Sequence, residues 1–275
     1  MRSSRRVSAL RYVVLSLLAA LFLLPFYVLL RNGFSSERLM AAAQWRWVPD
    51  EVNLGNLREL FANDSVRMAR SMANSAVVAV VQTLATVVIS ALAGYGLARI
   101  DHRLSRLVLG LTVLTLMVPA AVTFIPSFVL VSSLGWISTL RGLIIPVLFS
   151  AFATFLFRQF FLGFPRELEE AAYIDGAGYW RTFWRVVMPN TYGICAAVGT
   201  ITFIGSWNAF LWPLLIGQDR DFRTVQVALS QFMSSQRVDV PQLFVGAAVA
   251  ILPVLLVFLF LQRYLVQGVE RSGID

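Results

Sequence analysis

The chain contains few side chains of the kinds that carry out chemistry. All 23 of its basic residues are arginines, and its one histidine and one cysteine are His102 and Cys195. A P-loop needs a lysine to hold the phosphates of its nucleotide, and a Schiff-base enzyme needs a lysine amine. The sequence therefore predicts neither an ATPase site nor Schiff-base chemistry, and it has too few ligands for a zinc site.

The polar segment 164–189 is the strongest candidate for a functional site. Pro165 is followed there by Glu167, Glu169 and Glu170. Proline is tolerated in the first turn of a helix, and carboxylates favour the positive end of the helix dipole. These residues predict a helix that starts beside Pro165.

The same segment predicts a turn and a second helix. Asp175-Gly176 should end the first helix, because glycine readily takes the left-handed conformation found at helix ends. Residues 179–187 should form the second helix, which Pro189 ends.

The first helix of this segment has a possible docking face. Ala171 and Ala172 are flanked by carboxylates, and small side chains let a helix enter a groove on a partner protein. The alternative is an ordinary helical hairpin at the membrane interface, where the aromatic residues of the second helix would suit the headgroup level.

The composition indicates that an integral membrane protein must position this segment. Of the 275 residues, 58% are hydrophobic and 14% are charged, and the mean hydropathy is +0.72. Soluble domains have about 25% charged residues, and a membrane-spanning helix needs about 20 mostly apolar residues. The stretches that match this pattern are residues 12–30, 74–98, 107–131, 142–157, 191–216 and 243–262.

The arginines predict the orientation. With the N-terminus inside the cell, 13 arginines fall in cytoplasmic segments and 10 in outer ones, and four of the 13 precede the first span. This asymmetry predicts that both termini are cytoplasmic. The first span should be retained, because its apolar run is long for a signal peptide and no small-residue cleavage site follows it.

The interiors of the six spans contain no aspartate, glutamate, lysine, arginine or histidine. A secondary transporter or channel subunit should carry such a residue to couple ions, and a membrane-embedded enzyme needs polar catalytic groups at depth. Both remain alternatives, but the sequence favours a transport subunit that takes its energy from another protein.

The segment 164–189 resembles the EAA motif of the permease subunits of binding-protein-dependent ABC importers. In that motif Glu-Ala-Ala is followed by three residues and a glycine, and nine residues later by Ile-x-Leu-Pro. The chain has Glu170-Ala171-Ala172 and Gly176 at this spacing, and Val-Val-Met-Pro at the end. The resemblance implies that the loop couples the permease to an ATPase through Glu167, Glu170, Ala171, Ala172, Asp175, Gly176 and Pro189.

Three other motifs resemble the carbohydrate-type branch of these permeases, in particular the smaller permease subunit of the maltose importer. They are Asn74-Ser75, Gly94-Tyr95-Gly96-Leu97-Ala98-Arg99 and Trp207-Asn208-Ala209-Phe210-Leu211-Trp212-Pro213-Leu214. Ala209 replaces the usual acidic residue of the last motif, so no role of that carboxylate carries over. Arginine as the only basic residue type, with abundant alanine and valine, further suggests a GC-rich genome and an actinobacterial sugar importer.

The resemblance implies an all-α membrane protein with six transmembrane helices and the type I ABC importer permease fold. Residues 1–73 would comprise a cytoplasmic segment, the first span and an outer loop. Residues 74–268 would form the permease core with its cytoplasmic coupling loop 159–190, and residues 269–275 a cytoplasmic tail.

The resemblance also implies partners. They are a second homologous permease subunit, an ATPase dimer docked on the EAA loop, and an extracytoplasmic binding protein, expected to be a lipoprotein. The chain itself should need no cofactor or metal, because the ATPase subunits bind ATP and Mg²⁺, and no nucleic acid is expected. Candidate substrates are a disaccharide, an amino sugar and a glycerophosphodiester.

The fifth span holds candidate substrate contacts. If Asn208 lies at the centre of a helical face, Trp207 and Trp212 could supply aromatic platforms beside its amide, which would suit a sugar. The alternative is that Asn208 bonds a neighbouring helix while the tryptophans pack. The same two interpretations apply to Gln82 in the second span and Thr123 in the third.

Overall fold

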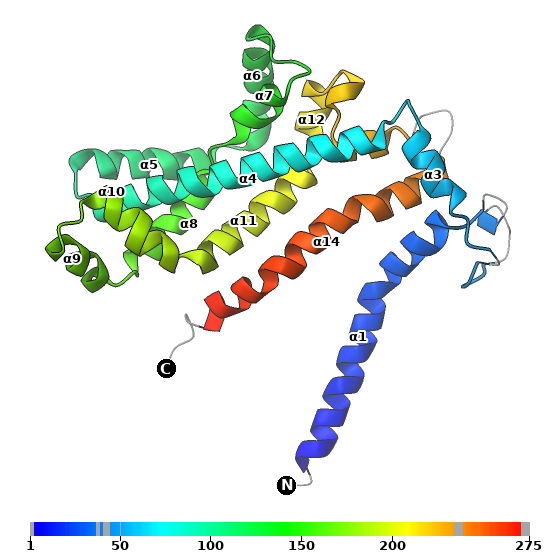
Figure 1. Cartoon of the computed structure of the whole chain (residues 1–275), viewed down its shortest axis with the longest axis horizontal. Coiled ribbons are helices and arrows are strands. Elements are labelled where there is room, and N and C mark those ends of the chain that lie inside the picture. The colour runs from blue at the N-terminus through cyan, green and yellow to red at the C-terminus, as the bar shows by residue number, and fades with distance from the viewer. Residues whose placement is uncertain (1–2, 37–38, 41–44, 50, 234–238, 271–275) are drawn as a thin grey trace. The chain divides into compact units, whose positions relative to one another are not determined.

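The computed structural model describes residues 3–36, 39–40, 45–49, 51–233 and 239–270. Helices dominate these residues (Figure 1). The chain divides into two compact units, one of Met1–Ala69 with Val227–Leu252 and one of Arg70–Gln226 with Pro253–Asp275. The domain boundaries expected at residues 73 and 268 stay a prediction.

The first unit is built on α1 (Ser3–Gly33), α3 (Gly55–Ala62) and the first part of α14 (Val240–Glu270). A Cβ atom at Gly33 would lie only 2.9 Å from the backbone nitrogen of Val245, so these two helices pack closely there. The buried Asn56 donates to the carbonyls of Gly33 and Ser35 at 2.8 and 3.0 Å. These bonds connect the end of α1 to α3.

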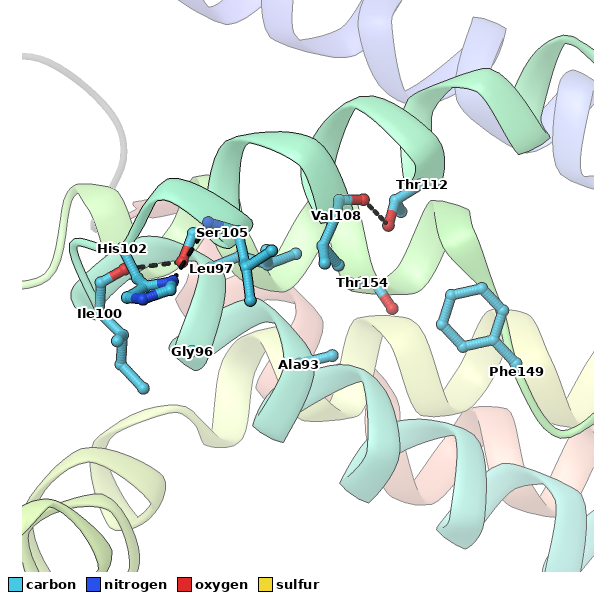
Figure 2. Close-up of a pocket in the computed structure, with 11 residues that line it drawn as sticks. Ala93, Gly96, Leu97, Ile100, His102, Ser105, Val108, Thr112, Phe149 and Thr154 are labelled. Atoms are coloured by element: carbon cyan, nitrogen blue, oxygen red, sulfur yellow. Dashed lines mark hydrogen bonds between the residues drawn. The ribbon is translucent and has the colours of Figure 1, made fainter.

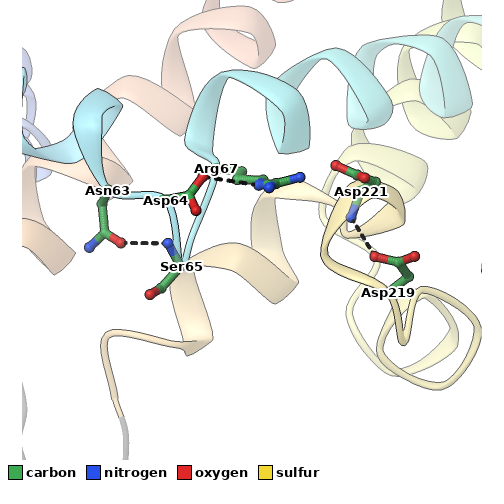
Figure 3. A network of polar contacts seen from close by, with 6 residues as sticks. All are labelled: Asn63, Asp64, Ser65, Arg67, Asp219 and Asp221. Atoms are coloured by element: carbon green, nitrogen blue, oxygen red, sulfur yellow. Dashed lines mark hydrogen bonds and ion pairs between the residues drawn. The ribbon is translucent and has the colours of Figure 1, made fainter.

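A short polar turn precedes the next helix. The carboxamide oxygen of Asn63 accepts a hydrogen bond from the backbone of Ser65 at 3.0 Å. Arg67, which has a positive φ of 49°, forms an ion pair with Asp64 at 3.3 Å (Figure 3). The turn leads into α4 (Met68–Arg99).

The second unit contains most of α4 and the helices that follow it in the chain as far as α12 (Figure 1). After α4, they are α5 (Arg103–Met117), α6 (Ala120–Ser133), α7 (Leu140–Ile144), α8 (Ala151–Leu162), α9 (Arg166–Ile174), α10 (Tyr179–Thr182), α11 (Tyr192–Trp207) and α12 (Leu211–Ile216). A further helix, α13 (Val225–Ser230), begins in this unit and ends in the first.

Three helices are individually long and apolar enough to cross a membrane. They are Leu10–Gly33, Met68–Arg99 and Val240–Arg263, and they match the predicted first, second and sixth spans. Three bent pairs pass the same test, so the described residues provide up to six spans. The predicted count of six is consistent with this range.

Three of the predicted spans are not single helices. The third, residues 107–131, consists of α5 and α6, which meet at 101°. Pro119 lies at this bend, where its ring and its missing N–H interrupt the helix. The fourth, residues 142–157, bends by 45° between Leu140–Val147 and α8. The fifth, residues 191–216, breaks between α11 and α12.

Polar side chains start several helices of the second unit. His102 precedes α5, and its Nδ1 accepts from the backbone of Leu104 at 3.2 Å. Ser150 precedes α8, and its Oγ accepts from the backbone of Ala153 at 3.1 Å. Such caps satisfy backbone donors that the first turn leaves free. His102 thus has a structural role at a helix end.

Two hydrophobic clusters form the core of the second unit. The first is mainly aromatic and joins α4, α8 and the segment after α10; its members are Ala91, Tyr95, Ala153, Phe157, Phe161, Phe164, Phe183, Val187 and Val198. The second is mainly aliphatic; its members are Val78, Val131, Leu143, Ile144 and Ile216. They lie toward opposite ends of α4, called here the Arg99 end and the Asn74 end.

Candidate functional site

The EAA-like segment forms the predicted helix, turn and helix. α9 follows Pro165 and ends at Asp175, and Gly176 has a positive φ of 77°. The backbone N–H of Ala177 donates to the carbonyl of Ala172 at 2.9 Å, and that of Gly176 to Tyr173 at 3.0 Å. These two bonds form a Schellman motif, which a left-handed glycine allows.

The second helix of the segment is irregular. α10 continues as a π-helix over Phe183–Val187 and as a 3₁₀ turn over Met188–Asn190. Pro189 lies in that last turn, where the helix ends as predicted. A bend of 78° then leads into α11.

A buried ion pair holds α9 against the Arg99 end of α4. Arg99 donates from Nε to Oε1 of Glu169 at 2.7 Å, and each side chain is only 6% exposed. The second carboxylate oxygen accepts from the hydroxyl of Tyr95 at 3.0 Å. Arg99 also donates to the carbonyl of Phe164 at 2.6 Å. Charged donors and acceptors make short, strong hydrogen bonds, so both ends of the pair are well satisfied.

Aromatic rings pack beside this ion pair. The ring of Tyr95 lies 5.5 Å from that of Phe161 and 5.0 Å from that of Phe183. Edge-to-face and tilted arrangements at such distances are the favourable ones for aromatic pairs. The residues before and after α9 are therefore attached to the same part of α4. We call the ion pair and these rings the loop seat.

The exposed face of α9 differs from the predicted one. Ala171 is exposed, but Ala172 is buried at 9% exposure. Neighbouring residues on a helix point about 100° apart, and Ala172 lies three positions after the buried Glu169, so it faces the protein. The expectation that both alanines form the outer face is therefore wrong. The exposed side chains among the predicted coupling residues are Glu167, Glu170, Ala171, Asp175 and Pro189.

The Asn74 end of α4 is bound to the loop after α12 by neutral hydrogen bonds. The buried carboxamide of Asn74 donates to the carbonyls of Asp221 and Arg223 at 2.7 and 3.0 Å. The hydroxyl of Ser75 accepts from the backbone of Val225 at 2.8 Å. Within the loop, Asp219 accepts from the backbone of Asp221 at 3.2 Å (Figure 3). Asn74-Ser75 thus fixes the path of this loop.

Residues 67–271 match the family described as the inner membrane component of binding-protein-dependent transport systems. The chain belongs to this family. The resemblance seen in the EAA-like segment is confirmed, and the chain is a multi-pass component of the cell membrane.

Relatives match this transport component over nearly all of its length. The arabinooligosaccharides transport system permease protein AraQ of Bacillus subtilis is 32% identical and covers 94% of this chain and 92% of its own. The lactose transport system permease protein LacG of Rhizobium radiobacter is 34% identical and covers 95% and 94%. The sn-glycerol-3-phosphate transport system permease protein UgpE of Yersinia pestis is 32% identical and covers 95% of both chains.

A solved structure has the same fold. It is a crystal structure of a bacterial ABC transporter involved in the import of the acidic polysaccharide alginate, and its matching chain is 21% identical with a TM-score of 0.82. The match covers 96% of this chain and 98% of that one. The predicted all-α fold of ABC importer permeases is confirmed.

The predicted substrate contacts of the fifth span are placed differently from the expected helical face. α11 ends at Trp207, which is buried and stacked on Phe203 with ring centroids 5.8 Å apart. Asn208 follows the helix and accepts from the side chain of Gln226 at 3.0 Å. Trp212 belongs to α12 and donates to the carbonyl of Gly142 at 3.1 Å. Since the helix stops at Trp207, no continuous face forms around Asn208. The contacts match the alternative interpretation, in which Asn208 bonds a neighbouring helix, here α13, and Trp207 packs. A substrate role for these residues stays a prediction.

The other two candidates bond to backbone carbonyls. Gln82 donates to Val147 at 3.3 Å, and the exposed Thr123 donates to Ala120 within its own helix at 3.1 Å. A substrate role for these residues stays a prediction.

A cavity of about 400 Å³ lies between α4, α5 and α8 (Figure 2). Its polar side chains are satisfied locally: the hydroxyls of Ser105 and Thr112 donate to the carbonyls of Ile100 and Val108 at 2.9 and 2.8 Å. Thr154 donates to the carbonyl of Ser150 at 2.9 Å. Sugar sites present free polar groups to the ligand, so this cavity does not resemble one.

Glu169 was not identified from the sequence as a contact of α4. It was counted there only as an acid in the first turn of a helix. One available signal was Arg99, which closes the apolar second span and needs a partner if it is buried. Three candidate acids lie close together in α9, and pattern alone could not select Glu169 among them.

Proposed function

We propose that this chain is a permease subunit of an ATP-driven importer that moves a sugar or sugar-like solute from a binding protein into the cytoplasm. The names of AraQ, LacG and UgpE refer to arabinooligosaccharides, lactose and sn-glycerol-3-phosphate. These names support an oligosaccharide, a disaccharide or a phosphorylated polyol as the class of substrate.

The observation that carries the proposal is the loop seat. In an importer of this kind, nucleotide-driven movement of an ATPase must reach the membrane helices through the permease. α9 presents exposed Glu167, Glu170 and Ala171, while its buried Glu169 bonds to Arg99 on α4. A force on the outer face of α9 would therefore act directly on the Arg99 end of α4.

The partners follow from this division of roles. With no lysine in the chain, ATP hydrolysis belongs to separate ATPase subunits that bind ATP and Mg²⁺, and α9 is the segment that docks on one of them. A second permease subunit would complete the transmembrane pathway, and a binding protein would deliver the substrate. The first span is long and apolar, so its surface suits contact with lipid or with the second permease.

The orientation belongs to the same proposal. The loop seat and the Arg99 end of α4 would face the cytoplasm, and the Asn74 end and its loop would face the binding protein. In a Cys195→Ser chain, a cysteine at Gly178 should react only with reagents that reach the cytoplasm. A cysteine at Gln218 should react from outside.

The coupling role can be tested at Gly176. Gly176→Val forces a β-branched residue into a left-handed conformation and should disrupt the turn after α9. Gly178→Val is the matched control, because Gly178 has an ordinary φ of −80° and a Cβ added there would have no atom of the described residues within 4 Å. Glu170→Arg tests the exposed charge independently, and Thr182→Ser is a mild second control.

The expected result is loss of substrate uptake and of ATPase co-purification for Gly176→Val and Glu170→Arg, with normal membrane insertion. Gly178→Val and Thr182→Ser should transport like the wild type. Wild-type uptake by both test variants, with the ATPase still bound, would refute a coupling role for this loop.

A further inference from the structure

The segment after α9 lies almost perpendicular to a membrane helix. Residues Tyr179–Asn190 meet the apolar α11 at 78°. The ring of Phe183 lies 5.0 Å from that of Tyr95, four residues before the end of the membrane-spanning α4. If α4 and α11 cross the bilayer, this segment runs along the membrane surface at the level of the headgroups.

The segment has two sides of different character. On one side, Thr182, Phe183 and Val187 are buried inside the second unit, to which the segment belongs. Trp180 and Trp184 lie one turn apart, with ring centroids at 5.9 Å, and they are 66% and 39% exposed. Tryptophan is enriched at the boundary between membrane and water, because its ring is apolar and its N–H is polar. These two rings are therefore suited to that boundary.

Two exposed arginines lie next to these tryptophans in the sequence. Arg181 and Arg185 are exposed and lie one turn apart. Neither forms an ion pair or a side-chain hydrogen bond within the described part of the chain. The sequence from residue 176 to residue 218 contains no aspartate or glutamate. The charge carried by this segment itself is thus only positive, and the acids nearest to it in the sequence belong to α9 and its end at Asp175.

We propose that the Trp–Arg face, formed by Trp180, Arg181, Trp184 and Arg185, binds the headgroups of anionic phospholipids in the cytoplasmic leaflet. The two arginines would contact lipid phosphates, and the two tryptophans would lie at the glycerol level between neighbouring lipids. The proposal requires the orientation given under the proposed function, but it does not depend on the substrate or on the docking of α9.

Charge distinguishes this face from the outer face of α9. The exposed residues of α9 include Glu167 and Glu170, with Asp175 directly after the helix, and these acids would be repelled by an anionic membrane surface. The Trp–Arg face carries only positive charge and lies at the level where α4 ends. The loop therefore has an acidic part suited to a basic groove on a protein and a basic part suited to lipid. Lipid bound at the Trp–Arg face would hold this segment at the membrane surface, while α9 would stay free to dock on an ATPase subunit.

The test uses the complete importer, with all its subunits, in nanodiscs of phosphatidylcholine with or without phosphatidylglycerol. Brominated phosphatidylglycerol reports proximity by quenching tryptophan fluorescence, and native mass spectrometry counts the bound lipids. The variant Arg181→Gln/Arg185→Gln should bind phosphatidylglycerol less tightly by roughly fivefold for each arginine, as expected for basic residues at an anionic membrane surface. Trp180→Phe/Trp184→Phe should remove the quenching that brominated phosphatidylglycerol causes at this face.

The matched control is Arg103→Gln/Arg106→Gln, which removes two exposed arginines from the start of α5. Unchanged lipid affinity in Arg181→Gln/Arg185→Gln, or an equal loss in the control, would refute a specific lipid site. Loss of the ATPase from Arg181→Gln/Arg185→Gln in both lipid mixtures, without a change in lipid binding, would show a protein interface instead. Failure of the coupling role would appear separately, as normal uptake by Gly176→Val.

Discussion

The two ends of α4 are held by different kinds of interaction. At the Arg99 end, a buried ion pair with Glu169 and a group of aromatic rings attach α9 to the membrane helix. At the Asn74 end, the carboxamide of Asn74 and the hydroxyl of Ser75 bond to the backbone of a loop. One end uses charge and side-chain packing, and the other uses neutral bonds to main-chain atoms.

This difference has an energetic meaning. Removing one partner of a buried ion pair leaves an unpaired charge and costs about 3–5 kcal/mol, whereas a neutral hydrogen bond contributes about 0.5–1.5 kcal/mol. Removing a single side chain should therefore destabilise the Arg99 end more than the Asn74 end. This difference agrees with the proposed function, in which α9 would transmit force and the loop at the Asn74 end would face the binding protein.

The largest expected effect is at the ion pair. Arg99→Met leaves the carboxylate of Glu169 buried, and the hydroxyl of Tyr95 is then its remaining side-chain donor among the described residues. This substitution should lower the free energy of unfolding by about 3–5 kcal/mol. Thermal unfolding of the purified protein and limited proteolysis of the loop 164–189 measure this effect. We expect cleavage in the loop before global unfolding.

The double variant Arg99→Met/Glu169→Leu serves as the control. Replacing both members of a buried pair by apolar residues is often neutral or stabilising, so the double variant should be more stable than Arg99→Met. If it is equally unstable, the ion pair is not what holds α9, and the contrast between the two ends fails.

The next largest loss of stability is expected when Gly94, near the Arg99 end of α4, is replaced by alanine. A Cβ at Gly94 would lie 2.7 Å from Cβ of Phe157 and 2.8 Å from the backbone nitrogen of Arg158. Gly94→Ala should therefore push α4 and α8 apart and cost about 1–3 kcal/mol. In Gly96→Ala the nearest atom would be Cδ1 of Ile100 at 4.0 Å, so this control should unfold like the wild type. Equal stability of the two variants would show that close packing does not fix this end.

The smallest expected effect is at the Asn74 end. Asn74→Ala removes two hydrogen bonds to the carbonyls of Asp221 and Arg223 and should cost about 1–2 kcal/mol. The cost should be local, so hydrogen exchange should become faster in residues 219–225 while the loop seat stays protected. Faster exchange at both ends would mean that the two ends are not independent.

The sequence predicted the function and the local structure of the loop better than the course of the spans. Pro165, Gly176 and Pro189 carry conformational signals in their own side chains, or in the lack of one, so the helix, turn and helix could be inferred directly. Hydropathy identifies an apolar stretch but does not show whether it is straight. Pro119 could have kinked a continuous helix, and only its surroundings produce a bend of 101°.

The sequence also predicted only part of the candidate site. The motif indicated the exposed Glu170, whereas selecting the buried Glu169 required knowing which side of α9 meets α4. The same limit applies to Trp207 and Asn208: the pattern left open whether they share a helical face, and α11 ends between them. Contacts between segments distant in the sequence leave little trace in a single sequence.

The bend at Pro119 has a consequence for which parts of this chain can contact lipid. α5 has 15 residues and so a length of about 22 Å, which is less than the ~30 Å of the hydrocarbon core. If α5 and α6 together form one span, the bend lies within the bilayer, where Pro119 offers no N–H to the preceding turn and Met117 is 75% exposed. Irregular backbone survives at that depth only where protein covers it or where it lines a hydrated space. A cysteine at Ala121 in a Cys195→Ser chain should accordingly react with a water-soluble maleimide in the assembled importer if the bend is hydrated. If the second permease covers the bend, this cysteine should react with neither water-soluble nor lipid-soluble reagents. Reaction with the lipid-soluble reagent alone would show that the bend faces lipid. In both of the expected cases, hydrated or covered, the backbone at the bend would not face lipid.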